Sequence, residues 1–334
     1  MIEESNKKTA GNPESEPDKN TLKSGTSNII KRLAIYLLLA FAPDWILVFL
    51  YAAHGGEYGT ATMGLILALA MLCPAIAVLL TRRLTGEGMS LTGPNSLKLG
   101  MDFKNKKWIW YLLAIFLPVI YGNLGAIVVL LVYPGLYDPT MVEAVGASSA
   151  IHILLPLSAI VNGVVVSFGA LGEELGWRTY LYPKLEALMG TGKAVVVGGI
   201  IWGIWHLPEL LMGHGYGNDY WGEPWSGLIS FTLFCIYMGG LLWFVTKVTD
   251  SVWPAAFLHA INNAGSASLQ VYINMDNIDH ASPHYILALS LLHLPVLLIM
   301  IAAVLYLRKH KNEELADHVK VHNTRKQTVV KKAK

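Results

Sequence analysis

Long apolar segments alternate with short polar ones along most of this chain of 334 residues. Eight of the apolar segments reach or approach the roughly 20 residues that an α-helix needs to cross the hydrocarbon core of a bilayer. We expect membrane spans at residues 33–53, 60–81, 108–133, 149–171, 194–213, 226–246, 251–273 and 284–307. The pattern predicts an all-α membrane protein, a polytopic bundle of about eight transmembrane helices.

The two ends of the chain differ from this bundle. Residues 1–32 are polar and contain no apolar core that could serve as a signal peptide, so we expect a disordered cytosolic tail. Residues 308–334 are expected to form a second, basic cytosolic tail. One transmembrane domain, residues 33–307, lies between the tails, and its motif core covers residues 150–265.

Composition supports the membrane assignment. The chain is 54% apolar and 14% charged, against about 45–50% and about 25% in an ordinary soluble domain. The tails contain 15 of the 25 Lys and Arg residues, so the bundle has too few charges for a soluble surface, and its partner is the lipid bilayer. Two isolated cysteines exclude a disulfide scaffold, and no basic face with interleaved aromatic residues indicates nucleic acid.

The basic residues also predict the orientation of the bundle, because cytosolic loops are enriched in Lys and Arg. Four alternate loops, at 54–59, 134–148, 214–225 and 274–283, contain no Lys or Arg. They contain seven acidic residues, Glu57, Asp138, Glu143, Asp219, Glu223, Asp276 and Asp279. Eight spans with both termini in the cytosol place all 25 basic residues on the cytosolic side.

Ionisable side chains inside predicted spans are costly in lipid and are therefore candidate functional residues. Asp44 follows Pro43 in the first span, and we expect it to pair with backbone groups that the proline frees. His152 and His293 lie near the ends of their spans, where satisfied or interfacial roles are expected.

The fourth span ends in two adjacent carboxylates and an arginine. Glu174 and Arg178 are four residues apart, so they share a helix face and can neutralise one another. Glu173 points about 100° away from Glu174 and lacks a cation. A partly desolvated carboxylate of this kind suits the role of a general base.

Two later spans contribute the other polar groups. His206 stands in the fifth span, where Pro208 removes a helical hydrogen bond nearby. His259 and Asn263 are four residues apart in the seventh span and face the same way. One carboxylate, two imidazoles and one amide fit the activation of a water and the stabilisation of an oxyanion, with or without a metal.

A shared site also requires a common depth. Glu173 would lie too shallow if the fourth helix ended at residue 171, so we expect that helix to continue through Arg178 to about Tyr182, with Pro183 marking its exit. Glu173 would then reach a water that also contacts His206 and His259. We expect this water to occupy a cavity that opens to the cytosolic half of the membrane.

In these residues the sequence resembles the CAAX-protease and bacteriocin-processing family of intramembrane endopeptidases, which includes the type II CAAX prenyl endopeptidases. The family pattern E-E-x-x-x-R, F-x-x-x-H and H-x-x-x-N on successive helices is matched by residues 173–178, 202–206 and 259–263. The one departure is Trp202 in place of Phe. The ordered trio of motifs covers about residues 150–265, while the outlying spans match only in being hydrophobic.

The resemblance implies a role for each matched residue. Glu173 would activate water with help from His206, and His259 and Asn263 would bind the carbonyl oxygen as it becomes an oxyanion. Glu174 and Arg178 would support them. If the enzyme uses zinc, Glu173, His206 and His259 would be its three protein ligands, with water as the fourth; otherwise no cofactor is needed.

The implied function is cleavage of membrane-associated peptides or proteins, either of CAAX type or related to bacteriocins. A different class of function remains open, because the same polar residues could line the cavity of a transporter or of a peptide-binding or immunity scaffold that cuts nothing.

We predict that both tails face the cytosol, because four alternate loops contain no Lys or Arg. Single cysteines placed at Ser27 and at Asn218 test this topology with an impermeant reagent applied to intact cells. Labelling at position 218 but not at position 27 is expected. The reverse pattern would mean that the topology is inverted.

Overall fold

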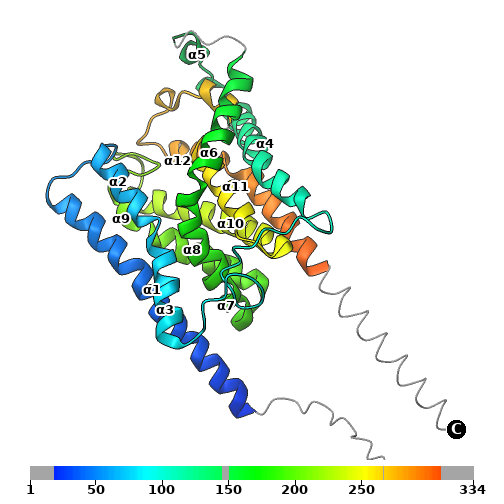
Figure 1. Cartoon of the computed structure of the whole chain (residues 1–334). Helices are drawn as coiled ribbons and strands as arrows, with labels where there is room; N and C mark the ends of the chain where they lie inside the picture. The colour runs from blue at the N-terminus through cyan, green and yellow to red at the C-terminus, as the bar shows by residue number, and fades with distance from the viewer. Residues whose placement is uncertain (1–18, 145–149, 266, 310–334) are drawn as a thin grey trace, which may run out of the picture.

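The computed structural model describes residues 19–144, 150–265 and 267–309 (Figure 1). Its labelled α-helices are α1 (Lys19–Ala53), α2 (Ala61–Ala70), α3 (Cys73–Thr85), α4 (Trp108–Val132), α5 (Thr140–Ala144), α6 (Ile151–Gly176), α7 (Tyr182–Met189), α8 (Thr191–Trp205), α9 (Leu207–Leu211), α10 (Trp225–Thr249), α11 (Trp253–Asn263) and α12 (Pro283–Leu291). A π-helix, η2 (Trp177–Leu181), joins α6 to α7, and short 3-10 turns lie at η1 (Pro134–Leu136), η3 (Ser268–Tyr272) and η4 (Met275–Asn277). These ranges contain no β-strand, which confirms the all-α fold.

Five helical segments of the described chain are long and apolar enough to cross a membrane, which agrees with a polytopic membrane protein. They cover Gly25–Ala53, Ala61–Thr85, Trp108–Val132, Ile151–Met189 and Trp225–Thr249. A sixth is counted if Pro283–Leu291 and Leu294–Lys309, which meet at an angle of 47°, form one broken span. The expected count of eight is not confirmed.

The difference arises at the predicted fifth and seventh spans, which are shorter helices. The fifth is α8, which has 15 residues and ends at Trp205 because His206 leaves helical geometry just before Pro208. The seventh is α11, which has 11 residues, and the chain leaves it through Gly265 at a φ of 71°. Both contain a motif histidine, so hydropathy overestimated helix length where the site interrupts the helix.

The fourth span continues well beyond residue 171, as the requirement for a shared depth predicted. Helices α6, η2 and α7 form a continuous helical segment of 39 residues, Ile151–Met189. The predicted exit at Pro183 is wrong, since the helix passes through it. Pro183 stands in the first turn of α7, where the π-turn has already shifted the hydrogen-bond register, so its missing N–H is tolerated.

Residues 1–32 were expected to form a disordered tail. Helix α1 begins at Lys19, so residues 19–32 are helical instead. At the other end, the last described helix includes Arg308 and Lys309. The remaining parts of the two predicted tails, residues 1–18 and 310–334, lie outside the described residues.

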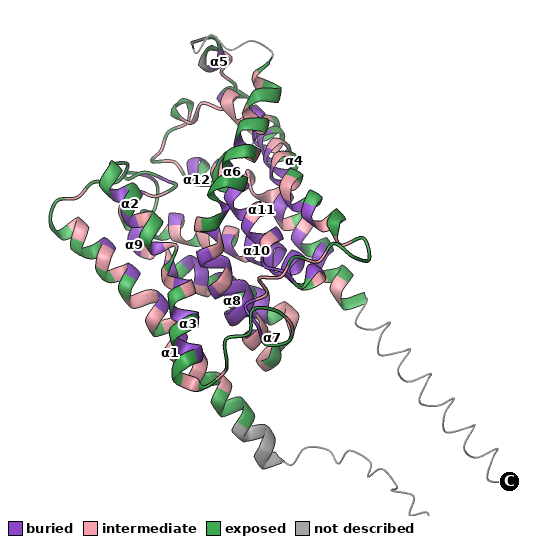
Figure 2. Ribbon diagram, in the orientation of Figure 1, coloured by how far each residue is buried: buried purple, intermediate pink, exposed green. Residues whose placement is uncertain are grey.

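The buried core lies where α8, α10, α11 and η2 meet, while the outer faces of α1, α4 and the first half of α6 carry exposed apolar side chains that suit contact with lipid (Figure 2). Glycines allow the inner helices to approach closely. A Cβ at Gly163 of α6 would lie 2.6 Å from the Cα of Ile261 on α11, and one at Gly203 of α8 would lie 2.8 Å from the Cα of Thr232 on α10. Small residues of this kind are typical of helix contacts in membranes.

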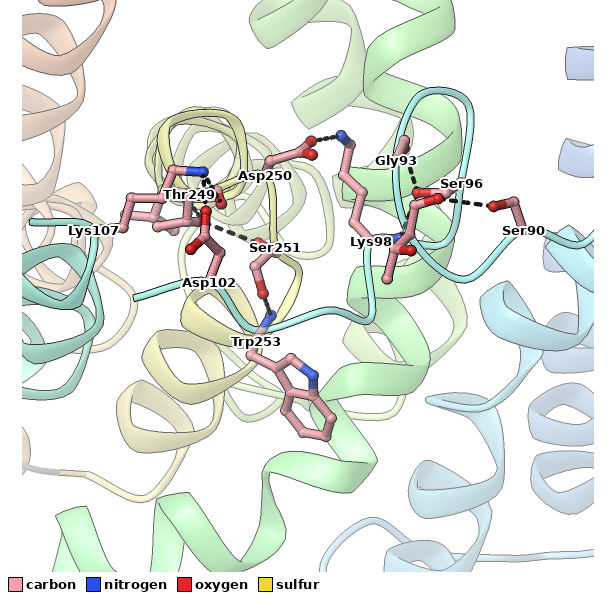
Figure 3. Close-up of polar contacts among 12 residues, drawn as sticks. Ser90, Gly93, Ser96, Lys98, Asp102, Lys107, Thr249, Asp250, Ser251 and Trp253 are labelled. Carbon is pink, nitrogen blue, oxygen red and sulfur yellow. Dashed lines mark hydrogen bonds and ion pairs between the residues drawn. The ribbon is translucent and has the colours of Figure 1, made fainter. Parts of the chain in front are cut away.

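The connection between α3 and α4, residues 86–107, ties the ends of several helices together (Figure 3). Lys98 forms an ion pair with Asp250, the residue that follows α10 in a left-handed conformation. Trp253, the first residue of α11, donates its indole N–H to the carbonyl of Leu99 at 2.9 Å. The start of the helix that holds His259 is therefore anchored by a segment more than 150 residues earlier.

Glu87 is the centre of a second group of polar contacts at this end of the bundle. Its side chain is 2% exposed and accepts hydrogen bonds from Lys184 at 2.7 Å and from the hydroxyl of Tyr180, and Arg32 lies 3.6 Å away. Burial by itself raises the pKa of Glu87, but the hydrogen bonds from Lys184 and Tyr180 and the nearby charges outweigh it and lower the pKa below its ordinary value of 4.5.

We predict that replacing Glu87 with Gln lowers thermal stability in detergent at neutral pH, by an amount on the order of 2 kcal/mol, because a buried Lys184 loses its anion. A carboxylate with a lowered folded pKa contributes its full stabilisation above 4.5, and that contribution disappears as the pH falls through the folded value. Melting temperatures of the wild type and Glu87→Gln should therefore converge in acid. A constant gap between them down to acidic pH would contradict this account.

Candidate active site

The structure places all four predicted catalytic residues on one cavity of about 510 Å³. Glu173 lies near the end of α6, His206 at the break between α8 and α9, and His259 and Asn263 on α11. The predicted supporting residues, Glu174 and Arg178, lie behind the cavity wall and are fully buried. Three separate helices therefore contribute to the site, as the motif order predicted.

Trp202 of α8 is the side chain around which these residues gather. Its indole N–H donates to Glu173 Oε2 at 2.8 Å, and Trp177 donates to the same oxygen at 3.2 Å. The ring centroids of His259 and His206 lie 5.5 Å and 6.1 Å from that of Trp202. Two donors on one oxygen fix the carboxylate of Glu173 and leave Oε1 without a hydrogen bond from the described residues.

Glu174 holds two partners at once. Its Oε2 lies 3.1 Å from Nε of Arg178, the predicted pair four residues apart, and both side chains are fully buried. Its Oε1 lies 2.8 Å from Nδ1 of His259. The guanidinium of Arg178 lies 4.3 Å from the ring centroid of Trp202, which is the range of a cation–π contact. Glu174 therefore orients His259 and leaves its Nε2 for the cavity.

His206 is held by ring contacts. Trp205 and Phe231 meet it edge to face at centroid distances of 4.6 Å and 5.0 Å. The ring of His214 lies nearly parallel to it at 6.0 Å. Burial lowers the pKa of His214, which keeps that ring neutral near pH 7, and the Tyr58 hydroxyl lies 2.5 Å from its Nδ1. A neutral His214 therefore places no positive charge on this side of His206.

Asn263 stands at the end of α11, where its side chain is exposed toward the cavity. Its amide oxygen accepts a hydrogen bond from Nδ2 of Asn262 at 3.2 Å, and the oxygen of Asn262 accepts one from the Tyr121 hydroxyl at 2.8 Å. This chain of amides fixes the orientation of Asn263, so that its N–H₂ group remains available as a donor.

The cavity does not extend in the expected direction. Part of its lining comes from residues 214–216 and from Gln270 of η3, which lie in or next to the loops that lack Lys and Arg. Among the described residues, no lining comes from the basic connection 86–107. The expected opening toward the Lys- and Arg-rich end is therefore wrong. Hydropathy sets the depth of a residue but not the side on which neighbouring helices leave space.

A three-ligand zinc site is not assembled in this conformation. Within the described residues, no three His, Cys, Asp or Glu side chains lie together in an arrangement that could hold a metal ion. One oxygen of Glu173, the proposed acidic ligand, is already engaged by two indole N–H groups.

Several residues of the site were not identified from the sequence. Trp202 was noted only as a departure from the family pattern and Trp177 was given no role, yet both donate to Glu173. The spacing of four residues between Glu173 and Trp177 was the available signal. Asp44 was expected to pair with backbone groups near Pro43, but its carboxyl group faces that of Glu209 on α9. No local pattern links these two positions.

Comparison with known proteins agrees with the motif assignment. Residues 154–265 match the family model described as type II CAAX prenyl endopeptidase Rce1-like. A Methanococcus maripaludis protein named CAAX prenyl protease 2 is 31% identical over 101 residues, which cover 30% of this chain and 37% of that relative. The family model thus covers the segment that holds the three motifs, and the chain spans little more than a third of that relative's length.

We predict that Arg178 is mainly structural. Removing one partner of a buried ion pair leaves an uncompensated charge, at a cost of roughly 3–5 kcal/mol. Arg178→Ala should therefore lower the melting temperature in detergent, and its activity should be lost together with its stability. The exposed Arg83→Ala is the matched control and should melt like the wild type. If Arg178→Ala abolished cleavage without a change in melting temperature, the arginine would belong to the chemistry.

Proposed function

Since residues 154–265 match the family model described as type II CAAX prenyl endopeptidase Rce1-like, we propose that this protein is an intramembrane endopeptidase. The observation that carries the proposal is that Glu173, His206, His259 and Asn263, from three helices, line one cavity. The chain matches little more than a third of its relative's length, so cleavage is inferred from the site and not transferred from the relative.

In the proposed reaction, Glu173 acts as the general base. Both indole donors bind Oε2, so Oε1 is the oxygen that accepts a proton from water. His206, on the same cavity, orients that water. The water oxygen then attacks the carbonyl carbon of the peptide bond, and negative charge develops on the carbonyl oxygen.

His259 and Asn263 are the proposed donors to this oxyanion. When His259 is doubly protonated, Nδ1–H bonds to Glu174 and Nε2–H remains for the substrate. The Asn263 amide supplies a second N–H from the same cavity. Fixed donors aimed at a developing negative charge are among the largest contributions to acyl-transfer catalysis.

The same hydrogen bond from His259 to Glu174 would also suit a metal site, where a carboxylate orients a zinc-bound histidine. We favour the metal-free reaction, because the described side chains do not gather three ligands. Metal analysis of the purified protein, and activity before and after treatment with a chelator, distinguish the two chemistries.

The substrate is proposed to be a membrane-associated peptide or protein. The cavity extends toward the end of the bundle that lacks Lys and Arg, and the predicted topology places this end away from the cytosol. The two substrates to compare are those that the family resemblance implies, a prenylated CAAX peptide and an unprenylated, membrane-inserted peptide related to bacteriocin precursors.

We predict that Glu173→Gln abolishes cleavage of whichever peptide the wild type cuts. Gln accepts the indole hydrogen bonds but cannot take a proton, so a loss of about 10²–10⁴-fold is expected. The assay uses purified full-length protein in proteoliposomes, with cleavage followed by mass spectrometry. Glu57→Gln, which removes an exposed carboxylate from a loop, is the control and should cleave normally.

Two results would contradict the proposal. Cleavage that persists in Glu173→Gln would exclude this residue as the base. Specific binding of a peptide to the wild type without any cleavage would instead favour the scaffold or transporter function.

A further inference from the structure

Two carboxyl groups that the proposed mechanism does not use lie buried beside the cavity. Asp44 of α1 is 0% exposed and Glu209 of α9 is 1% exposed. The two groups are close enough to interact through a hydrogen bond, and no other side chain of the described residues donates to their four oxygens. An ionised carboxylate can only accept hydrogen bonds, so the two can bond to each other only if one carries a proton.

The position of the pair is fixed by the packing of α1 against α8. Trp45 donates its indole N–H to the carbonyl of Trp205 at 3.0 Å, and Trp205 donates to the carbonyl of Ala40 at 3.2 Å. These reciprocal bonds hold Asp44 against the break where α8 passes into α9. Glu209 lies one turn beyond Trp205 and lines the catalytic cavity.

The surroundings of the pair supply no strong cation. The ionisable groups that interact with it are Glu173 on α6, the thiol of Cys73 on α3 and the hydroxyl of Tyr58. His206 and His214 flank Glu209 along the chain, and burial favours the neutral form of His214. Two adjacent carboxylates without a cation cannot both stay ionised in a buried site. One shared proton removes a charge and forms the missing hydrogen bond.

We propose that Asp44 and Glu209 hold one proton between them, and that Glu209 donates it into the cavity, to the leaving nitrogen of the cleaved peptide. This role rests on the proposed endopeptidase function. Glu173 takes a proton from the attacking water, the C–N bond breaks, and the leaving nitrogen takes the proton of the pair. Transfer of the proton from Glu173 to the pair, through water in the cavity, restores both groups. One water is consumed, and the products are a carboxylic acid and an amine.

The first test is spectroscopic and does not depend on a substrate. The infrared spectrum of the full-length wild type in lipid should show the C=O stretch of a buried, protonated carboxylic acid at neutral pH, with a shift in D₂O. Asp44→Asn and Glu209→Gln should each lose this band, and the exposed Glu57→Gln should keep it.

The second test is kinetic. The amide of Asn in Asp44→Asn, or of Gln in Glu209→Gln, can donate to the remaining carboxylate, so a purely structural role would be preserved and both variants should fold. With a proton donor lost, kcat/KM should fall roughly 10²-fold. The part of the alkaline decline of kcat/KM that comes from the pair losing its proton should be absent in both variants, whereas the part that comes from deprotonation of His259 should remain.

The outcomes separate this proposal from the proposed function. Two results would mean that a cation replaces the proton, and either would overturn the proposal. One is a wild type without the band. The other is a melting temperature that rises with added Na⁺ or Ca²⁺ in the wild type but not in Asp44→Asn. Variants that lose the band but keep the wild-type rate and pH profile would overturn the donor role. A wild type that shows the band but cleaves neither peptide would refute the endopeptidase function and the donor role of Glu209. The proton shared by Asp44 and Glu209 would still be supported.

Discussion

The arrangement of the site depends on the ion pair between Glu174 and Arg178, which has no exposed side-chain surface. In a low-dielectric interior neither charge could remain alone, so the two residues stay together and their neighbours must accommodate them. Glu174 also binds His259 on α11, and Arg178 lies against the ring of Trp202 on α8. Because Trp202 donates to Glu173, the ion pair determines where the proposed base lies.

The helices are irregular at the residues that carry the candidate functional side chains, and each irregularity has a physical cause. The π-turn at Trp177–Leu181 contains Arg178, four residues after Glu174, and buries it in the bundle. Pro208 ends α8 at His206, and α11 stops at Asn263. Interrupted helices allow polar groups to face a common cavity in the middle of a membrane protein, where backbone polarity is tolerated only next to protein or water.

The cavity extends toward one end of the bundle, and the polar contacts that support the site lie at the other end. The connection 86–107 anchors the start of α11 through the bond from Trp253 to Leu99, and Glu87 joins the connection to Lys184 on α7. The cavity extends the other way, toward residues 214–216 and Gln270. Polar contacts at one end thus position the helices, while the other end leaves space for a ligand.

Periodicity and spacing within single segments were sufficient to predict the all-α membrane fold and the pairing of Glu174 with Arg178, because these features depend on residues close together in the chain. The continuation of the fourth helix past residue 171 followed from the requirement that Glu173 share a depth with His206 and His259. The grouping of Glu173, His206, His259 and Asn263 came from motif order. Tertiary structure alone decided the direction of the cavity, the second role of Glu174 at His259 and the contact between Asp44 and Glu209. Partners 85 and 165 positions apart are brought together by helix packing, and no local pattern in a sequence encodes which faces of distant helices will meet.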